Sequence, residues 1–272
     1  MVRLMSAYLP KKMIAQVTVI ATLCPFRATP IENCLMSGKT IVFLYLLIMP
    51  QLVLAQDECV VLLHGLARMS NAMGELENKL QHAGYKVANV NYPSRRFGIS
   101  ALAADAVGRG LTQCKAMSTD TVHFVTHSLG GILLRVYLKE QNLDELGHVV
   151  MLGPPNQGSE LVDGLGSVPG FSWFFGPVSR ELGTAAGSIV PELGPANFDL
   201  GVIAGNSNIF PLFNLLRPGP SDGIITVEST KVDGMKQHLV LPVTHTFMMR
   251  NDTVIDHTIH YLKTGSFIPT SW

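Results

Sequence analysis

The sequence has little charge and few cysteines, and both shortages exclude broad classes of function. Charged residues make up only 15% of its 272 residues, and the formal net charge is zero. We therefore expect no binding of nucleic acid through a strong positive field. The four cysteines form no C-x-x-C pair and no cluster with histidine, so the sequence predicts no metal site and no other cofactor.

The sequence also has no internal repeat and no disordered composition. Apolar residues account for 47% of the chain, which is enough for a sizeable core. A chain of this length fits one α/β domain or two small ones.

The first 55 residues differ in character from the remainder. Lys39 precedes an apolar stretch over 41–50, and Val53 and Ala55 form the small-residue pattern of a signal-peptidase cleavage site. The stretch is shorter than the roughly 20 apolar residues of a full membrane span. We therefore expect a signal peptide.

These features divide the chain in two. Met36 stands where a signal peptide of ordinary length would begin, so we interpret residues 1–35 as an upstream extension. An uncleaved membrane anchor over 41–55 is the alternative. The sequence predicts export, to the periplasm or outside the cell, of a globular domain over 56–272.

Within that domain, short apolar runs alternate with helical patterns. The runs have the length and composition of strands buried on both faces, and they lie at 59–63, 86–91, 121–126, 148–152, 201–205 and 237–241. Apolar residues at helical spacing predict helices over 70–83, over 99–116, from 129 onward and over 251–263. This alternation predicts an α/β fold with a mostly parallel sheet and helices on both faces.

One interval, 158–197, breaks the alternation. It is rich in Gly and Pro and contains the aromatic residues Phe171, Trp173, Phe174 and Phe175. Because long insertions in compact domains are often functional, the interval is a candidate substrate-contacting lid. Its aromatic residues are a candidate membrane interface. The alternative is a surface excursion whose aromatic side chains pack back onto the core.

Ser128 lies at the turn of a strand-turn-helix pattern. Such a nucleophile elbow holds a serine hydroxyl clear of the backbone, where a base can reach it. Gly130 occupies one of the two positions that are normally glycine, but Thr126 stands at the other. Ser128 is thus a candidate nucleophile, and the alternative is a serine that only caps the following helix.

Four motifs together resemble the α/β-hydrolase superfamily. His64-Gly65-Leu66 follows the first strand, Ser128 lies within Thr126-His-Ser-Leu-Gly130, and Ser221-Asp222-Gly223 and His245 come later, in the order of that fold. The likeness covers roughly residues 58–263. It is a likeness to small bacterial secreted lipases and esterases of the triacylglycerol lipase type. It implies a minimal α/β-hydrolase fold.

The resemblance also implies a role for each site residue. Ser128 would attack an acyl carbonyl, His245 would take the serine proton, and Asp222 would hold the imidazole in the required tautomer. The backbone N–H groups of Leu66 and Leu129 would form the oxyanion hole.

Other acidic residues are worse placed for this role. Asp199 precedes its strand and so lies at the wrong end of a parallel sheet, whereas Asp252 and Asp256 come after His245, in the closing helix. Asp222 falls beyond a strand, at the end where sites in open α/β sheets lie. The remaining histidines are expected to be structural, including His127, which neighbours Ser128 but should point elsewhere.

The function that follows is hydrolysis of carboxylic esters, with lipid-like acyl esters favoured by the resemblance and by the apolar insertion. A thioesterase, an amidase or an acyltransferase could use the same triad, because acyl transfer does not specify the leaving group. A non-catalytic, membrane-tethered binding protein is a further alternative.

The resemblance also predicts a disulfide. In this fold the strands at 59–63 and 121–126 are neighbours, so their starts lie together. Cys59 opens the first strand, and Cys114 ends the helix that leads to the second. A Cys59–Cys114 bond is therefore expected in an exported chain.

Overall fold

The computed structural model describes residues 57–165, 170, 173, 175–184, 188–208 and 219–269. All of them belong to the second of two compact units of the chain, Leu54–Trp272. The extension over 1–35 and the signal peptide or anchor over 41–55 lie outside the described residues. Within the described ranges, no helix is both long enough and apolar enough to cross a membrane.

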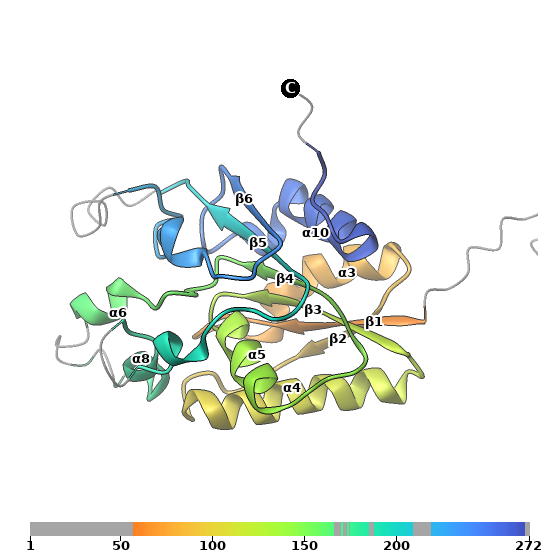
Figure 1. Cartoon of the computed structure of the whole chain (residues 1–272), viewed down its shortest axis with the longest axis horizontal. Coiled ribbons are helices and arrows are strands. Elements are labelled where there is room, and N and C mark those ends of the chain that lie inside the picture. Colours follow the sequence, from red (N-terminus) through yellow and green to blue (C-terminus); the bar gives the residue numbers. More distant parts are fainter. Residues whose placement is uncertain are drawn as a thin grey trace, which may run out of the picture. The chain divides into compact units, whose positions relative to one another are not determined.

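A six-stranded sheet forms the centre of the domain (Figure 1). Its order is β2-β1-β3-β4-β5-β6, and every neighbouring pair is parallel. The strands are β1 (Glu58–Leu63), β2 (Lys86–Val90), β3 (Thr121–His127), β4 (Leu146–Leu152), β5 (Leu200–Gly205) and β6 (Gln237–Leu241). The predicted strands are confirmed, and all six carboxyl ends share one edge of the sheet.

Helices cover both faces of this sheet. α4 (Ile99–Ala116) and α5 (Leu129–Glu140) lie on one face, and α3 (Gly74–His82) and α10 (Asp252–Thr264) on the other (Figure 1). Alternate residues of β1 face the two layers: Val61 belongs to the core beneath α4 and α5, and Val60 to the core beneath α3 and α10. This arrangement explains why the interior strands β1 and β5 are almost entirely apolar.

Short helical turns complete the domain. The helix expected over 70–83 begins as a 3-10 turn, η2 (Ser70–Met73), before α3. Two further 3-10 turns, η4 (Glu228–Thr230) and η5 (Met248–Arg250), lie in the loops that follow β5 and β6.

Part of the 158–197 interval packs onto the core. It contains α6 (Glu160–Leu165), α8 (Val178–Glu181) and η3 (Val190–Leu193). Val178, Leu182 and Val190 are buried in the cluster beneath α4 and α5. Among the predicted interface aromatics, Trp173 is 86% exposed and Phe175 is half-buried, whereas Phe171 and Phe174 lie outside the described residues.

The predicted disulfide is confirmed. Cys59 in β1 is bonded to Cys114 in α4, with their Cα atoms 5.6 Å apart. Both side chains are fully buried in the core. The bond therefore fixes α4 to the strand that it covers.

Candidate active site

Ser128 occupies a strained turn between β3 and α5. Its φ of 52° and ψ of −119° lie in a region that a residue with a Cβ rarely adopts, at a cost of about 1–3 kcal/mol. Its backbone N–H donates to Leu152 O across the neighbouring strand at 2.9 Å. The turn thus sits at the carboxyl edge of the sheet, between the ends of β3 and β4.

The Ser128 side chain does not cap α5. No hydrogen bond joins its hydroxyl to the first turn of the helix, and the Gly131 N–H donates instead to Ser128 O at 3.0 Å. Ser128 is partly exposed, whereas its neighbours His127 and Leu129 are buried. The capping alternative is therefore wrong, and the turn leaves Ser128 partly exposed.

The close packing of the elbow explains its glycines. A Cβ at Gly130 would lie 2.5 Å from Leu63 O, so no larger residue fits there. Thr126, at the position of the usual first glycine, is fully buried. Its hydroxyl would lie 3.2 Å from a Cβ at Gly131. The missing side chain of Gly131 makes room for Thr126, and the turn forms with a threonine in that place.

Asp222 and His245 form a buried hydrogen-bonded pair. His245 Nδ1 lies 2.7 Å from Asp222 Oδ2, and the two residues are only 5% and 2% exposed. Asp222 Oδ1 accepts the backbone N–H groups of Ile224 and Ile225 at 2.9 and 2.7 Å. His245 N–H also donates to Asp222 O at 3.0 Å. Backbone groups therefore fix the orientation of the carboxylate.

The end of β4 links this pair to Ser128. Leu152 accepts the Ser128 N–H, and the next residue, Gly153, lies against the pair. A Cβ at Gly153 would be 3.1 Å from both Asp222 Oδ2 and His245 Nδ1. The structure thus places Ser128, Asp222 and His245 around one short backbone segment.

His127 contacts His245, and the sequence did not predict this contact. It is 2% exposed, and its Nε2 lies 3.0 Å from His245 O, with the two ring centroids 4.7 Å apart. Burial, followed by the charge of His245, holds the pKa of His127 well below its usual value. A neutral His127 therefore supports the loop that carries His245. A histidine next to the candidate nucleophile was the only signal in the sequence.

The loop after β1 approaches the elbow from the other side. His64 is fully buried and stacks on Tyr92 with ring centroids 4.0 Å apart, and the Tyr92 hydroxyl donates to His64 O. A Cβ at Gly65 would lie 3.2 Å from the Cβ of Ser128. The backbone that follows Gly65, including the Leu66 N–H, therefore begins beside the Ser128 side chain.

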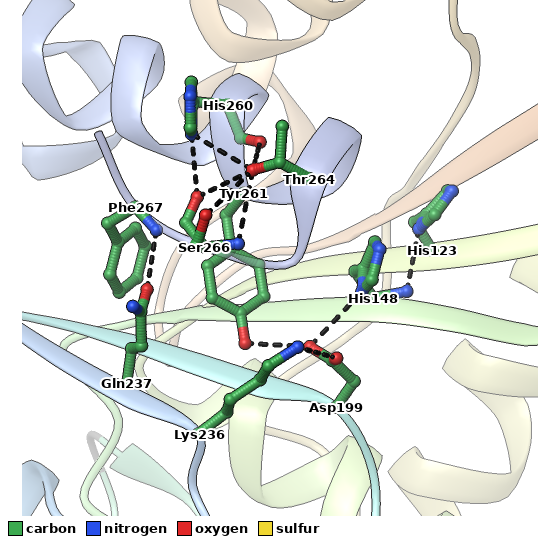
Figure 2. A network of polar contacts seen from close by, with 10 residues as sticks. All are labelled: His123, His148, Asp199, Lys236, Gln237, His260, Tyr261, Thr264, Ser266 and Phe267. Carbon is green, nitrogen blue, oxygen red and sulfur yellow. Dashed lines mark hydrogen bonds and ion pairs between the residues drawn. The ribbon is translucent and has the colours of Figure 1, made fainter. Parts of the chain in front are cut away.

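The rejected acid Asp199 belongs to a separate network at the amino end of the sheet (Figure 2). It contacts His148 at 3.2 Å, Lys236 at 2.8 Å and the Tyr261 hydroxyl at 2.8 Å. His148 N–H in turn donates to His123 Nδ1 at 2.8 Å. These groups contact one another and lie away from Ser128. No cluster of three or more metal-binding side chains occurs within the described part of the chain.

Comparison with known proteins identifies the fold. No protein-family model matches the sequence, and no curated protein matches it significantly. The mature form of a Bacillus licheniformis lipase aligns with a TM-score of 0.58 and 18% identity, over 76% of this chain and 91% of that one. A Legionella pneumophila phospholipase in complex with thio-NAD aligns with a TM-score of 0.59 and 18% identity, over 75% and 56%.

Lipase B of Aspergillus fumigatus aligns with a TM-score of 0.56 and 13% identity, over 77% of this chain and 53% of that one. The chain therefore spans only about half the length of the Legionella and Aspergillus proteins. Identities this low establish the fold alone. The chain has the α/β-hydrolase fold, as its motifs predict.

Proposed function

We propose that this protein is a serine hydrolase that cleaves carboxylic esters through an acyl-enzyme. The observation that carries the proposal is the position of Ser128, at a strained turn that is hydrogen-bonded to Leu152, whose neighbour Gly153 lies against the buried Asp222–His245 pair. A serine that only caps a helix needs neither the strain nor a neighbouring aspartate–histidine pair. The α/β-hydrolase fold and its lipase and esterase neighbours support ester hydrolysis at the level of the reaction class.

Each residue has a chemical task in this proposal. His245 Nε2 removes the proton from Ser128 as the hydroxyl oxygen attacks the acyl carbonyl. The ester C–O bond breaks when His245 returns the proton to the leaving alcohol. Water, activated by the same imidazole, then releases the carboxylate from Ser128. Asp222 accepts a hydrogen bond from the Nδ1–H group of His245, which keeps its proton, and stabilises the imidazolium that forms in both steps.

The negative oxygen of the tetrahedral intermediate needs donors in place. The N–H of Leu129 follows the nucleophile, and the N–H of Leu66 lies in the loop held by His64 and Tyr92. One such donor lowers the barrier by roughly 3–4 kcal/mol. Because these donors are backbone groups, replacing either leucine side chain should matter far less than moving its loop.

Exposed apolar side chains favour a lipid-like substrate. Met69, Phe97, Trp173 and Phe247 are 59%, 54%, 86% and 55% exposed. They come from segments that follow β1, β2, β4 and β6, at the carboxyl edge of the sheet. Apolar groups gathered around one edge are typical of contact with an apolar ligand or an interface. We infer that the acyl chains of the ester, or the lipid surface that holds them, contact this edge.

We further propose that the protein acts outside the cytoplasm. The buried Cys59–Cys114 disulfide is typical of an oxidising compartment. The signal peptide or anchor over 41–55 would deliver the domain there. A mature N-terminus just after Ala55, read by mass spectrometry from the exported protein, would distinguish a cleaved signal from an anchor.

Ester hydrolysis by the purified domain tests the function. p-Nitrophenyl esters of increasing acyl length should be turned over, and Ser128→Ala should reduce kcat by several orders of magnitude without unfolding the protein. Turnover that persists in Ser128→Ala would contradict the proposal. A lack of activity on long acyl chains would remove the lipid part of the claim and leave a short-chain esterase.

A further inference from the structure

A pocket of about 770 Å³ opens at the carboxyl edge of the sheet, the edge that also carries Ser128. It is formed by the loop after β1 and the loop after β2, with Trp173 contributing from the 158–197 interval. The two loops are tied together, because Ala67 N–H donates to the Ser94 hydroxyl at 3.0 Å and His64 stacks on Tyr92. Its volume lies in the range of small-molecule sites.

The charged side chains that line this pocket, among the described residues, are all positive. Arg68, Arg95 and Arg96 all line it, and none of the described lining residues is acidic. Within the described part of the chain, neither Arg68 nor Arg96 forms a salt bridge. The guanidinium groups of Arg68 and Arg96, in a protein of zero formal net charge, concentrate positive potential at this opening.

The pocket opens at the same edge of the sheet as Ser128. In the sheet, β1 lies between β2 and β3, so the loops that form the pocket are next to the elbow that ends β3. Arg68 is near enough to the elbow for its charge to act on the buried His127. A molecule whose acyl carbonyl reaches Ser128 can therefore place another part of itself among the arginines.

The rim of the pocket is apolar. Met69 and Trp173 line it, and Phe97 follows Arg96 directly in the chain. All three side chains are more than half exposed. Cationic groups that bind an anion, next to side chains that favour hydrocarbon, fit a molecule with both parts. Guanidinium groups match the oxygens of phosphate with paired, charge-assisted hydrogen bonds.

We propose that this pocket binds the phosphate of the substrate, which makes the natural ester a phospholipid rather than a neutral glyceride. The inference rests on the proposed function, because it assigns the substrate class of the same site. The scissile bond is still the acyl ester C–O bond, and water supplies the hydroxyl and proton of the products. The phosphate is bound and positioned, and it stays intact.

A pair of soluble substrates tests this assignment. The full exported domain is given 1,2-dihexanoylglycerol or its 3-phosphate, both below the concentration at which they aggregate, and the released hexanoate is measured. We expect kcat/KM to be at least about tenfold higher for the phosphate, and this preference should shrink as salt screens the arginines. In Arg68→Gln/Arg96→Gln the preference should fall roughly tenfold. Lys263→Gln, an exposed charge in α10, should leave it unchanged.

The outcomes separate the possible failures. Equal kcat/KM for the two esters in the unmodified protein, or a preference that survives in the double variant, would overturn the phosphate assignment and leave the hydrolase intact. Hydrolysis of neither ester would also overturn the phospholipid assignment, and the proposed function would be refuted only if p-nitrophenyl esters were not turned over either. A third arm presents dihexanoylglycerol on anionic vesicles. If the arginines matter only there, they attract the protein to a membrane and the substrate assignment is wrong.

Discussion

Replacing Asp222 by asparagine probes the chemistry of the site with little change in shape. Asp222 Oδ1 accepts two backbone N–H groups, from Ile224 and Ile225. An asparagine must keep its carbonyl oxygen at that place, so its NH₂ group faces His245 Nδ1. His245 can then accept only at Nδ1, and its proton moves to Nε2. A protonated Nε2 cannot take the proton of Ser128.

The size of the loss follows from the same contacts. Turning the amide around would leave two backbone N–H groups without an acceptor, at about 1–3 kcal/mol each. The imidazolium also loses a charge-assisted hydrogen bond of about 1.5–3 kcal/mol. Together these effects amount to about 3.5–9 kcal/mol, and the lower part of that range corresponds to a fall in kcat of roughly 10³–10⁴, similar to the effect of the same substitution in a serine-protease triad. Thermal stability should change little, because both backbone hydrogen bonds persist.

The assay compares kcat for a p-nitrophenyl ester in three proteins. These are the unmodified domain, Asp222→Asn and Asp199→Asn. Asp199 carries the same substitution in the network of Figure 2, at the opposite end of the sheet, so its kcat should stay within about twofold of the unmodified value. If Asp222→Asn kept kcat within tenfold, or if Asp199→Asn lost as much, the reasoning about the tautomer of His245 would be refuted.

Three further expectations concern stability. Replacing Cys59 and Cys114 by serine should lower the free energy of unfolding by up to about 4 kcal/mol, because the disulfide closes a loop with a sequence separation of 55 residues. The melting temperature measures this loss. An unchanged Tm would contradict a disulfide in the exported protein. Gly130→Ala should destabilise the domain by roughly 1–3 kcal/mol, because the new Cβ would collide with Leu63 O. Gly164 has open space around it, so Gly164→Ala should have no such effect. Equal denaturation midpoints for the two variants would contradict the close packing of the elbow. The free energy of unfolding should be highest above about pH 6.5 and should fall as the pH drops below that value. Burial lowers the pKa of several histidines in the folded chain. As the pH falls, the unfolded chain therefore binds protons before the folded chain does. His127→Asn should make that pH dependence of Tm shallower, and an unaltered slope would show that His127 is not held neutral.

The order of strands and helices was predictable because its signals are local. A strand buried on both faces is apolar at every position, and an amphipathic helix repeats every three to four residues. β5 and α10 therefore begin and end within one residue of their predicted bounds. The disulfide was also predictable, since the resemblance to the α/β-hydrolases implies that β1 and β3 are neighbours. The 158–197 interval has no such period, and its packing through Val178 and Leu182 depends on tertiary contacts that the sequence does not display.

The site shows the same division between local and distant effects. Ser128, Asp222 and His245 could be proposed from the order of their motifs and the resemblance to the α/β-hydrolases, which place them at the carboxyl ends of parallel strands. The backbone groups that orient Asp222 and the contact between His127 and His245 could not, since they depend on how distant loops pack. Thr126 is the clearest example of a residue whose fit depends on such distant packing. Its acceptance at the elbow depends on Gly131, five residues later, and on the approach of α5 to β4.

The most direct test of the central claim is covalent labelling of Ser128. A fluorophosphonate reacts only with a serine that a neighbouring base activates, so the folded domain should take up one label per chain, and peptide mass spectrometry should locate it on Ser128. Ser128→Ala should take up none, and Asp222→Asn should react far more slowly. Labelling at another serine, or no labelling of a domain that is folded, would contradict the assignment of Ser128 as the nucleophile.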